Sequence, residues 1–437
     1  MIRTPRIETM PRPELEAFQL ERLKNTVSYV YERVPFYKNA LQKSGISPGD
    51  IKTLADIALL PFTSKLDFRD NYPFGLTCVP RGEIVRVHSS SGTTGKPVIA
   101  PYTRKDIDVW AELIARSLVC AGMTREDVLQ NAYGYGLFTG GLGLHYGAER
   151  LGATVVPAST GNTKRQLMLL QDLGTTVISC TPSYAIILNE TAVEMGIDLK
   201  KTALRLGILG AEPWSENMRT DIENNLGITA LGIYGLTEIV GPGVAMECTH
   251  KTGMHIWEDN FLVEIIDPAS SAQLPYGHEG ELVITTINKE AQPVLRFRTK
   301  DLTSLNVKKC ACGRTMVRMS RITGRSDDMI RVRGVSVFPS QIESVLLTVE
   351  GIEPQYLIIV DRQNAFSSED LEVWVEVSEG IFSDEMTKMS ALQTRLQHEL
   401  DSVLGIKARI KLVEPKKLAR TEGKAKRVID RSELPKT

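Results

Sequence analysis

Between residues 105 and 235 the sequence alternates helix-like segments with short runs rich in β-branched and other apolar residues. "KRQLMLLQDLG" is followed by "TTVISCTP", and "SYAIILNETAVEMG" leads to "LRLGILGAEPW". Strands that alternate with helices of this length form βα units, and such units build a largely parallel sheet. This region therefore constrains the chain to an α/β fold. We expect the glycine-rich "GYGLFTGGLG" in the same region to be a loop.

The pattern changes after residue 256, where "FLVEIID", "GELVITTI" and "VLRFRTKDLTSL" alternate apolar and polar residues. Alternation predicts antiparallel strands, in a barrel-like β region or a second sheet. After residues 322–330 a compact α+β pattern follows, so we predict two domains, 1–326 and 327–437; an internal loop of one domain is the alternative. The expected fold is α/β, with a large N-terminal domain of mixed sheets flanked by helices and a small mobile α+β C-terminal domain.

The charges of the chain nearly cancel, because 52 Lys and Arg residues stand against 53 Asp and Glu residues. A formal net charge of −1 provides no strong field to recruit nucleic acid or a membrane surface. The N-terminal residues lack the apolar core of a signal peptide, and no apolar run approaches the about 18 residues of a membrane span. We therefore expect a cytoplasmic protein that binds neither.

A loop of small and hydroxyl-bearing residues, "SSSGTTGKPV", covers residues 89–98. It is not a P-loop, because Ser90 stands where that motif needs its first glycine and Pro97 follows Lys96. Pro97 also disfavours a helix start, and both flanks look like strands, so we expect the loop to join two strands. Such a loop would hold a phosphate through backbone N–H groups, hydroxyls and Lys96; a mobile hairpin is the alternative.

Three further segments have the residue types of a nucleotide site. "IYGLTE" puts Thr237 and Glu238 after an apolar run, where a hydroxyl and a carboxylate can meet a phosphate and its Mg²⁺. "RFRTKDL" contains Asp301, a carboxylate able to accept two hydrogen bonds from a ribose diol, and "TEGKAKRV" places Lys424 on a glycine-containing loop. The structural alternatives are a capping Thr/Glu pair, a turn aspartate and a solvated basic tail.

Cysteines and histidines gather in two other segments, "ECTHKTGMHIWED" and "KKCACGRT". The Cys310-x-Cys312 pair, with Cys248 and His255, offers the four N/S ligands of a structural zinc site. The spacing differs from the standard zinc-finger patterns, and unpaired thiols on two surface hairpins are the alternative. We choose His255 over His250 because it begins the "HIWED" run and is better anchored.

Taken in this order and at this spacing, the motifs resemble those of the adenylate-forming (acyl-CoA synthetase and luciferase-like) superfamily. The resemblance is closer to one branch, the phenylacetate–CoA ligases, and it covers nearly the whole chain. The segments that carry it are "YGYGLFTGGLGLHYGAERLG", "GAEPWS", "YGLTEIVGPGVAMEC", "GRSDDMIRVRGVSVFPSQIE" and "EGKAKRVID". One difference is Lys300, which precedes Asp301 where glycine is frequent in the wider superfamily.

The resemblance implies an AMP-forming acid–thiol ligase. Such an enzyme activates an aryl acetic acid, with phenylacetate as the first choice, as an acyl-adenylate, and transfers it to coenzyme A with release of AMP and pyrophosphate. One alternative is an adenylating enzyme that passes the acyl group to a carrier protein or another acceptor. Another is a degenerate nucleotide-binding protein without turnover. ATP, Mg²⁺ and coenzyme A would be bound, a structural Zn²⁺ is expected, and a homodimer is expected only by analogy.

The resemblance also implies roles for single residues. Lys424 would stabilise the negative charge that develops at the forming bond, and Lys426 is its rival for this role. Thr237 would contact the α-phosphate, and Glu238 would hold Mg²⁺. The ATP-binding residues would be Ser90, Ser91, Gly92, Thr93, Thr94 and Lys96 at the β- and γ-phosphates, Gly210, Ala211, Glu212, Pro213, Tyr234 and Gly235 around the adenine, and Asp301 and Arg325 at the ribose.

A flat apolar slot for the aryl ring is implied by the glycine-rich and aromatic segments. Its residues would be Tyr135, Phe138, Gly140, Gly141, Gly235 and Ile239. The resemblance further implies a hinge at Asp327, where the C-terminal domain would rotate, withdraw Lys424 and present the 330–336 loop to coenzyme A. An ordinary glycine-rich crossover with core aromatics is the alternative for the slot.

Overall fold

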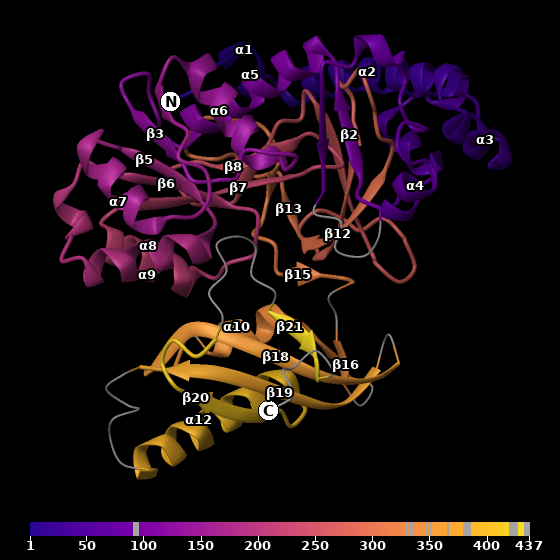
Figure 1. The fold of residues 1–437 in the computed structure, drawn as a ribbon. Helices are drawn as coiled ribbons and strands as arrows, with labels where there is room; N and C mark the ends of the chain where they lie inside the picture. Colours follow the sequence, from indigo (N-terminus) through magenta and orange to yellow (C-terminus); the bar gives the residue numbers. More distant parts are fainter. Residues whose placement is uncertain are drawn as a thin grey trace.

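A computed structural model of the protein describes residues 1–90, 96–327, 330–332, 335–346, 348–349, 351–364, 367–378, 386–418 and 427–431. Helices and strands form a large N-terminal body and a smaller C-terminal body, as Figure 1 shows. The two predicted parts of the chain therefore correspond to visibly different arrangements of secondary structure.

The largest sheet contains nine described strands, in the order β13-β14-β9-β8-β7-β6-β5-β3-β4. Neighbours from β7 to β4 are parallel, as the alternating pattern predicts, whereas β8, β9, β13 and β14 pair antiparallel. The bounds are β3 (Val128–Asn131), β4 (Thr154–Val156), β5 (Val177–Cys180), β6 (Leu206–Gly210), β7 (Thr229–Leu236), β8 (Gly241–Glu247), β9 (Met254–Ile256), β13 (Leu305–Asn306) and β14 (Arg318–Met319).

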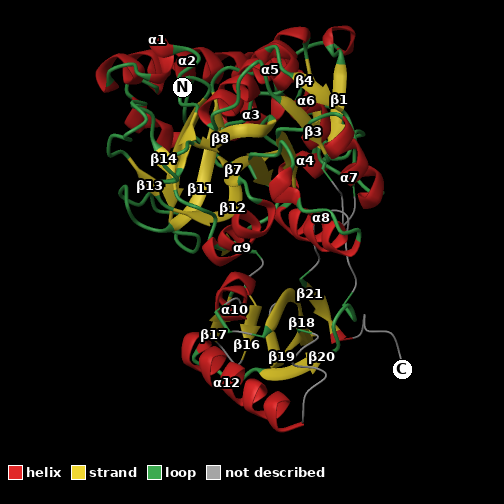
Figure 2. Ribbon diagram, turned by 90° about the vertical axis from the view of Figure 1, so that its left-hand side faces the viewer, coloured by secondary structure: helices red, strands yellow, loops and turns green. Residues whose placement is uncertain are grey.

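Helices cover this sheet. In Figures 1 and 2, α5 and α6 pack together above the sheet, and α7, α8 and α9 lie below it in one layer. Within the described residues, no helix combines the length and apolar character needed to cross a membrane. The helices of this body are α1 (Pro5–Glu8), α2 (Arg12–Arg33), α3 (Pro35–Lys43), α4 (Lys65–Asp70), α5 (Arg104–Cys120), α6 (Thr139–Leu151), α7 (Thr163–Asp172), α8 (Pro182–Glu194) and α9 (Glu216–Leu226), with 3₁₀ turns η1 (Pro48–Asp50), η2 (Leu54–Leu59), η3 (Arg81–Glu83) and η4 (Leu199–Lys201).

The second half of the glycine-rich stretch expected to be a loop is helical, because α6 begins at Thr139. Close helix packing explains the glycines. A Cβ at Gly147 would lie 2.0 Å from Ile114 Cγ2, and one at Gly143 would lie 2.5 Å from Trp110 Cζ2. Glycine is therefore required here so that α6 can approach α5, and the expectation of a loop was wrong for this part of the segment.

The alternating segments form antiparallel strands, as predicted, and these build a second sheet of four described strands. Its order is β10 (Phe261–Ile266), β11 (Gly280–Thr286), β12 (Phe297–Thr303) and β15 (Gly324–Arg325). A separate antiparallel hairpin, β1 (Arg86–Ser89) and β2 (Ile99–Tyr102), flanks the hydroxyl-rich loop. The prediction that this loop joins two strands is confirmed.

The C-terminal body has its own sheet and its own apolar core. Strands β18 and β19 form its centre, and residues such as Ile358, Val373 and Leu396 are fully buried between the sheet and its helices. The elements are β16 (Ile330–Val332), β17 (Val335–Val337), α10 (Pro339–Leu346), β18 (Ile352–Asn364), β19 (Ser367–Val377), α12 (Met386–Leu404), β20 (Arg409–Val413) and β21 (Val428–Asp430).

A carboxylate is buried in this smaller body, on α10. Glu343 is 7% exposed, and burial raises its pKa from 4.5 to about 7, although the charge of Arg427 opposes the change. The folded state therefore binds a proton more tightly at Glu343 than the unfolded chain does. Stability is consequently lost as the pH rises from about 4.5 through about 7.

Replacing this carboxylate with its neutral isostere tests the sign of the effect. We expect Glu343→Gln to be about as stable as the natural protein at pH 5 and more stable, by about 1–3 kcal/mol, at pH 8. Urea unfolding at a series of pH values measures the difference. Glu399→Gln, at an exposed position of α12, should show no such divergence, and an equal divergence in both variants would contradict the prediction.

Candidate active site

The hydroxyl-rich loop is closed at its base by backbone hydrogen bonds. The Ser90 N–H donates to the Val98 carbonyl at 3.0 Å, and the Val98 N–H donates to Ser90 Oγ at 3.0 Å. Lys96 is exposed, and its Nζ lies 5.1 Å from the centroid of the Tyr72 ring. The other predicted phosphate contacts, Ser91, Gly92, Thr93 and Thr94, lie outside the described residues.

Thr237 and Glu238 lie in a tight turn that follows β7. The N–H groups of Ile239 and Val240 both donate to the Leu236 carbonyl at 3.2 Å, which closes the turn. Thr237 is 5% and Glu238 8% exposed. Among the described residues the one ion pair recorded for the Glu238 carboxylate is with the Lys65 ammonium, 4.0 Å away. A buried carboxylate with so little local pairing fits a divalent cation.

Tyr234, Asp301, Arg325 and Asp327 form one connected group. The Tyr234 hydroxyl donates to Asp301 Oδ2 at 2.6 Å, and Arg325 Nη1 donates to Asp301 Oδ1 at 2.7 Å. Arg325 also reaches Asp327, with Nε–Oδ1 and Nη2–Oδ2 distances of 3.0 and 3.2 Å. Burial, and then the charge of Asp301, raise the pKa of Tyr234, so its hydroxyl stays protonated. Three predicted nucleotide contacts thus meet the predicted hinge residue.

Lys300 explains why glycine is common before this aspartate. Its backbone φ is +68°, in the left-handed region that costs a non-glycine residue about 1–2 kcal/mol. Two contacts with Glu281 hold it there: the Lys300 N–H donates to Oε1 at 3.3 Å, and Nζ lies 3.5 Å from Oε2. The unusual lysine therefore keeps the same backbone bend and adds an ion pair.

The four predicted adenine residues of the "GAEP" segment differ in their surroundings. Ala211 and Pro213 are exposed, and Ala211 has a φ of +71°. Glu212 instead faces α8, because its Oε1 accepts the Ser183 N–H at 2.7 Å and also the Ser183 hydroxyl. Gly210 pairs with the neighbouring strand and has no room for a Cβ. Glu212 and Gly210 thus hold the segment in place, and Ala211 and Pro213 face outward.

The predicted aryl slot residues from the first segment lie together. The Asn131 amide donates to the Tyr135 hydroxyl at 2.9 Å and to the Gly141 carbonyl at 2.7 Å. A Cβ at Gly140 would lie 3.4 Å from Phe138 Cε1, and the Phe138 side chain is 43% exposed. Burial raises the pKa of Tyr135 to about 12. The Phe138 side chain is therefore accessible to solvent, and the Tyr135 side chain is held by the hydrogen bond that its hydroxyl accepts from Asn131.

The sequence reasoning missed the polar group that fixes Tyr135. Asn131 ends β3 and accepts the Ser179 hydroxyl at 2.9 Å, while the Tyr135 hydroxyl lies 3.2 Å from His145 Nδ1. His145 Nε2 is in turn 3.1 Å from Glu149 Oε1. Ligand sites in parallel sheets lie at the carboxyl ends of strands, so the position of Asn131 was a usable signal.

Of the two other predicted slot residues, Gly235 lies near the first segment and Ile239 does not. A Cβ at Gly235 would lie 2.0 Å from the Gly241 carbonyl, and a Cβ at Gly241 would lie 2.8 Å from Thr139 Cβ, at the start of α6. Gly235 is therefore connected to the aryl segment through Gly241, which packs against Thr139. Ile239, in contrast, is fully buried in the main core and borders a small cavity with Phe261.

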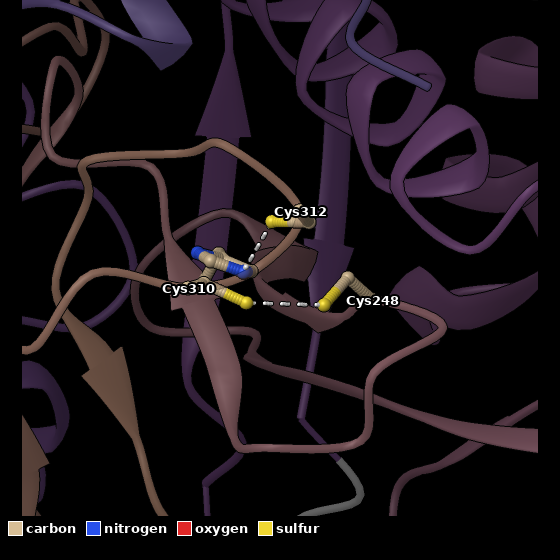
Figure 3. A group of neighbouring side chains, drawn as sticks. Cys248, Cys310 and Cys312 are labelled. Atoms are coloured by element: carbon tan, nitrogen blue, oxygen red, sulfur yellow. Dashed lines mark hydrogen bonds between the residues drawn. The ribbon is translucent and has the colours of Figure 1, made fainter.

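The four predicted zinc ligands meet in one cluster (Figure 3). Cys248 Sγ and Cys310 Sγ are 3.6 Å apart, and Cys312 Sγ is 3.3 Å from His255 Nε2. All four ligand atoms lie within 4.8 Å of one another, and three of the four residues are buried. Burial lowers the pKa of His255 to about 3, so the ring is neutral. His250, the rejected alternative, is exposed.

The loop that carries two of these cysteines also holds the N-terminus. Arg314 Nε donates to Glu8 Oε2 at 2.7 Å, and these side chains are 1% and 0% exposed. Glu8 Oε1 also accepts the backbone N–H of Thr4 at 2.7 Å, and the Thr315 N–H donates to the Glu8 carbonyl at 3.1 Å. This buried ion pair was not predicted, because its partners are more than three hundred residues apart.

The predicted catalytic lysine is in a segment that the structure leaves out. Lys424 and its rival Lys426 lie outside the described residues, as do residues 333 and 334 of the loop predicted to meet coenzyme A. The nearest described element is β21, which follows the lysine segment and pairs parallel with β18 in the sheet of the C-terminal body.

Known families and proteins match almost the entire chain. The AMP-binding enzyme family matches residues 15–288, and the AMP-binding enzyme C-terminal domain matches residues 334–432. The phenylacetate-coenzyme A ligase of Thermus thermophilus is 49% identical over 442 residues, covering 98% of this chain and 99% of that protein. The phenylacetate-coenzyme A ligase of Escherichia coli is 48% identical over 426 residues, covering 97% of this chain and 96% of that protein.

Solved structures of 2-hydroxyisobutyryl-CoA ligase resemble this chain in both domains. In the postadenylation state with 2-HIB-AMP, that enzyme matches with a TM-score of 0.92 at 31% identity, over 98% of this chain and 92% of its own. In the thioesterification state with 2-HIB-AMP and CoA, the TM-score is 0.73 at 32% identity, over 98% and 91%. The arrangement of this chain is thus nearer to the postadenylation state. The chain belongs to the AMP-binding, or adenylate-forming, enzymes, in the phenylacetate–coenzyme A ligase branch.

Proposed function

We propose that this chain is an AMP-forming ligase that joins phenylacetate, or a closely related aryl acetic acid, to coenzyme A. The observation that carries the proposal is the 49% identity to a phenylacetate-coenzyme A ligase over 98% of the chain. The site supports it, because a buried hydroxyl–carboxylate turn follows β7, an aromatic, glycine-lined segment follows β3, and Tyr234 of β7 donates a hydrogen bond to the Asp301–Arg325 pair of the second sheet. Passing the acyl group to another acceptor stays the alternative.

The chemistry has two steps. The carboxylate of the acid attacks the α-phosphorus of ATP, pyrophosphate leaves, and the thiol of coenzyme A then displaces AMP from the acyl-adenylate. Because the first step brings anions together, catalysis depends on positioning and on electrostatic stabilisation. Thr237 would contact the α-phosphate and Glu238 would hold Mg²⁺, which supplies positive charge to the phosphates when bound. Lys424 would stabilise the charge that develops at the forming bond.

We propose the following nucleotide contacts. Ser90 and Lys96, with the four residues from Ser91 to Thr94, would hold the β- and γ-phosphates. Ala211 and Pro213 would contact the adenine, whereas Gly210 and Glu212 would support them from behind. Asp301 and Arg325 would bind the ribose hydroxyls, and Tyr234 would stack on the base with its hydroxyl kept on Asp301, 2.6 Å away.

For the acid, we propose Tyr135, Phe138, Gly140, Gly141 and Gly235 as the lining of the aryl slot. The exposed Phe138 ring and the anchored Tyr135 support this choice. We give Ile239 an indirect role, because its side chain is in the core. Apolar pockets distinguish a methylene or hydroxyl group by only about 1–3 kcal/mol, so related aryl acids are expected as weaker substrates.

Asp327 is our candidate for the hinge between a domain of residues 1–326 and a domain of residues 327–437. The separate apolar core of the C-terminal body supports this division, as do the two states in which 2-hydroxyisobutyryl-CoA ligase was solved. We also propose a cytoplasmic location, where ATP and coenzyme A are supplied and the six cysteines, none of which is in a disulfide, stay reduced. A homodimer stays a prediction by analogy.

The Cys248–His255–Cys310–Cys312 cluster is proposed to hold a structural zinc ion. Around a tetrahedral zinc, two sulfur ligands are about 3.8 Å apart and a sulfur and a nitrogen about 3.6 Å. The observed separations of 3.6 and 3.3 Å are close to these values. The ion would join the hairpin of β8 and β9 to the loop that binds the N-terminus through Glu8 and Arg314.

Half-reaction assays test the ligase function. We expect pyrophosphate exchange that depends on phenylacetate, and AMP release with thioester formation once coenzyme A is added. A panel of benzoate, hydroxyphenylacetate and indoleacetate, run in the same assay, ranks the acids. Exchange without any thioester would favour the acceptor alternative, and no exchange with any aryl acid would reject the proposed function.

The catalytic lysine is tested by separating the two half-reactions. Lys424→Ala should slow adenylation by about 100-fold or more, the scale of losing a preorganised charge at the transition state. Thioester formation from supplied phenylacetyl-adenylate should stay largely intact. Lys426→Ala is the matched control two residues away, and normal adenylation by Lys424→Ala would show that the wrong lysine was chosen.

The zinc proposal predicts about one equivalent of zinc in protein purified without added metal, because the four ligands are already assembled. His255→Ala should lose most of this zinc and melt at a lower temperature. His250→Ala, which removes an exposed histidine of the same hairpin, should keep both. Elemental analysis and thermal melting measure the two effects; a natural protein with well below one equivalent would end the proposal.

A further inference from the structure

The backbone that follows the Thr237–Glu238 turn is held by side chains from three other elements. Three carbonyl groups within residues 239–242 each accept a hydrogen bond from a side chain far away in the sequence. The bonds are Lys289 Nζ to Ile239 O at 2.6 Å, Tyr102 Oη to Val240 O at 3.0 Å, and Trp110 Nε1 to Pro242 O at 2.9 Å. Lys289 is the one cation of the three, and it binds closest to the turn.

Lys289 is itself fixed in position. It belongs to the loop after β11, where the N–H groups of Glu290 and Ala291 donate to the buried Asp106 carboxylate at 2.7 and 2.9 Å. Its ammonium also lies 4.8 Å from the centroid of the Tyr102 ring. The lysine therefore approaches the turn from a loop that has little freedom to shift.

The carboxylates around Lys289 favour the charged form of its side chain. Burial lowers its pKa to about 8, while the carboxylates of Asp106 and Glu238 act in the opposite direction. The other polar rings nearby belong to His88 on β1 and Tyr102 on β2. A charged donor on a backbone carbonyl is stronger than a neutral one, so Lys289 is the firmest of the three anchors.

We propose that Lys289 is a positioning residue for adenylation, whose ammonium fixes the 236–240 turn so that Thr237 and Glu238 stay aimed at the α-phosphate and its Mg²⁺. The inference rests on the proposed function of these two residues. Among the described residues, two backbone hydrogen bonds of 3.2 Å close the turn and the pairing of Leu236 with Gly241 flanks it, and the Lys289 ammonium adds a charged side-chain anchor at the Ile239 carbonyl. Small displacements of catalytic groups cost large factors in rate.

Hydrogen exchange of the ligand-free protein tests the anchor directly. In Lys289→Met, amides of the 236–242 peptide should exchange at least about fivefold faster, a factor equal to roughly 1 kcal/mol of lost local stability. The peptide covering β6 should be unchanged. Lys289→Arg, which keeps a cationic donor, should restore most of the protection. Lys105→Met is the matched control, because it removes a 63% exposed lysine that pairs with the adjacent Glu290.

Adenylation kinetics test the consequence for catalysis. Lys289→Met should lower kcat for phenylacetate-dependent pyrophosphate exchange by about 10- to 100-fold and raise the Mg²⁺ concentration that is needed. The KM for phenylacetate should change little, and Lys289→Arg should recover most of the rate. Tyr102→Phe removes one hydroxyl from the same anchor set and should give smaller changes in the same direction, including where Lys289→Met folds poorly.

The outcomes separate this inference from the proposed function. Absence of exchange activity in the natural protein would reject the function, whereas full activity in Lys289→Met would overturn the role of Lys289. Unchanged hydrogen exchange at the turn, or an equal loss of activity in Lys105→Met, would overturn it too. The positioning role is supported if Lys289→Met loses both the hydrogen-exchange protection and kcat, and Lys289→Arg restores both.

Discussion

The parallel register of β3, β5, β6 and β7 is the constraint on which the rest of the site depends. Because Asn131 pairs with Ser179, and Gly210 pairs with Ile233, β3, β5 and β6 end nearly level at one edge of the sheet, and β7 runs on from there to Leu236. Every loop that leaves this edge therefore begins near the same point. The aryl segment, the "GAEP" segment and the Thr237–Glu238 turn are such loops, so one sheet edge determines which motifs meet.

Much of this was predictable because the signals are local. The βα alternation, the strand–loop–strand reading at Ser90 and Pro97, and the antiparallel pattern after residue 256 depend on neighbours in sequence. The Cys-x-Cys pair was predictable for a related reason, since ligand chemistry restricts the residue types that can meet, and His255 was preferred to His250 because it begins the "HIWED" run. The resemblance then ordered the motifs along the chain, but it did not supply their surroundings.

The residue roles that the sequence alone did not reveal depend on contacts between distant segments. The glycines at the start of α6 resemble a loop until Trp110 is known to lie against Gly143. Glu212 resembles an adenine contact until its carboxylate is found on Ser183. Ile239 resembles a slot residue, yet its side chain is in the core and its backbone carbonyl accepts the hydrogen bond from Lys289. Lys300 and Lys289 carry no motif, because their roles arise from backbone geometry and burial.

The guanidinium of Arg325 joins Asp301, which is proposed to bind the ribose, to Asp327, the proposed hinge. One nitrogen binds Asp301 at 2.7 Å while two others bind Asp327 at 3.0 and 3.2 Å, so both carboxylates contact the same cation at once. An exposed arginine pair alone contributes little to stability, but here its partners are a buried carboxylate and a domain boundary. One side chain thus connects the residue proposed to bind the ribose with the residue proposed as the hinge.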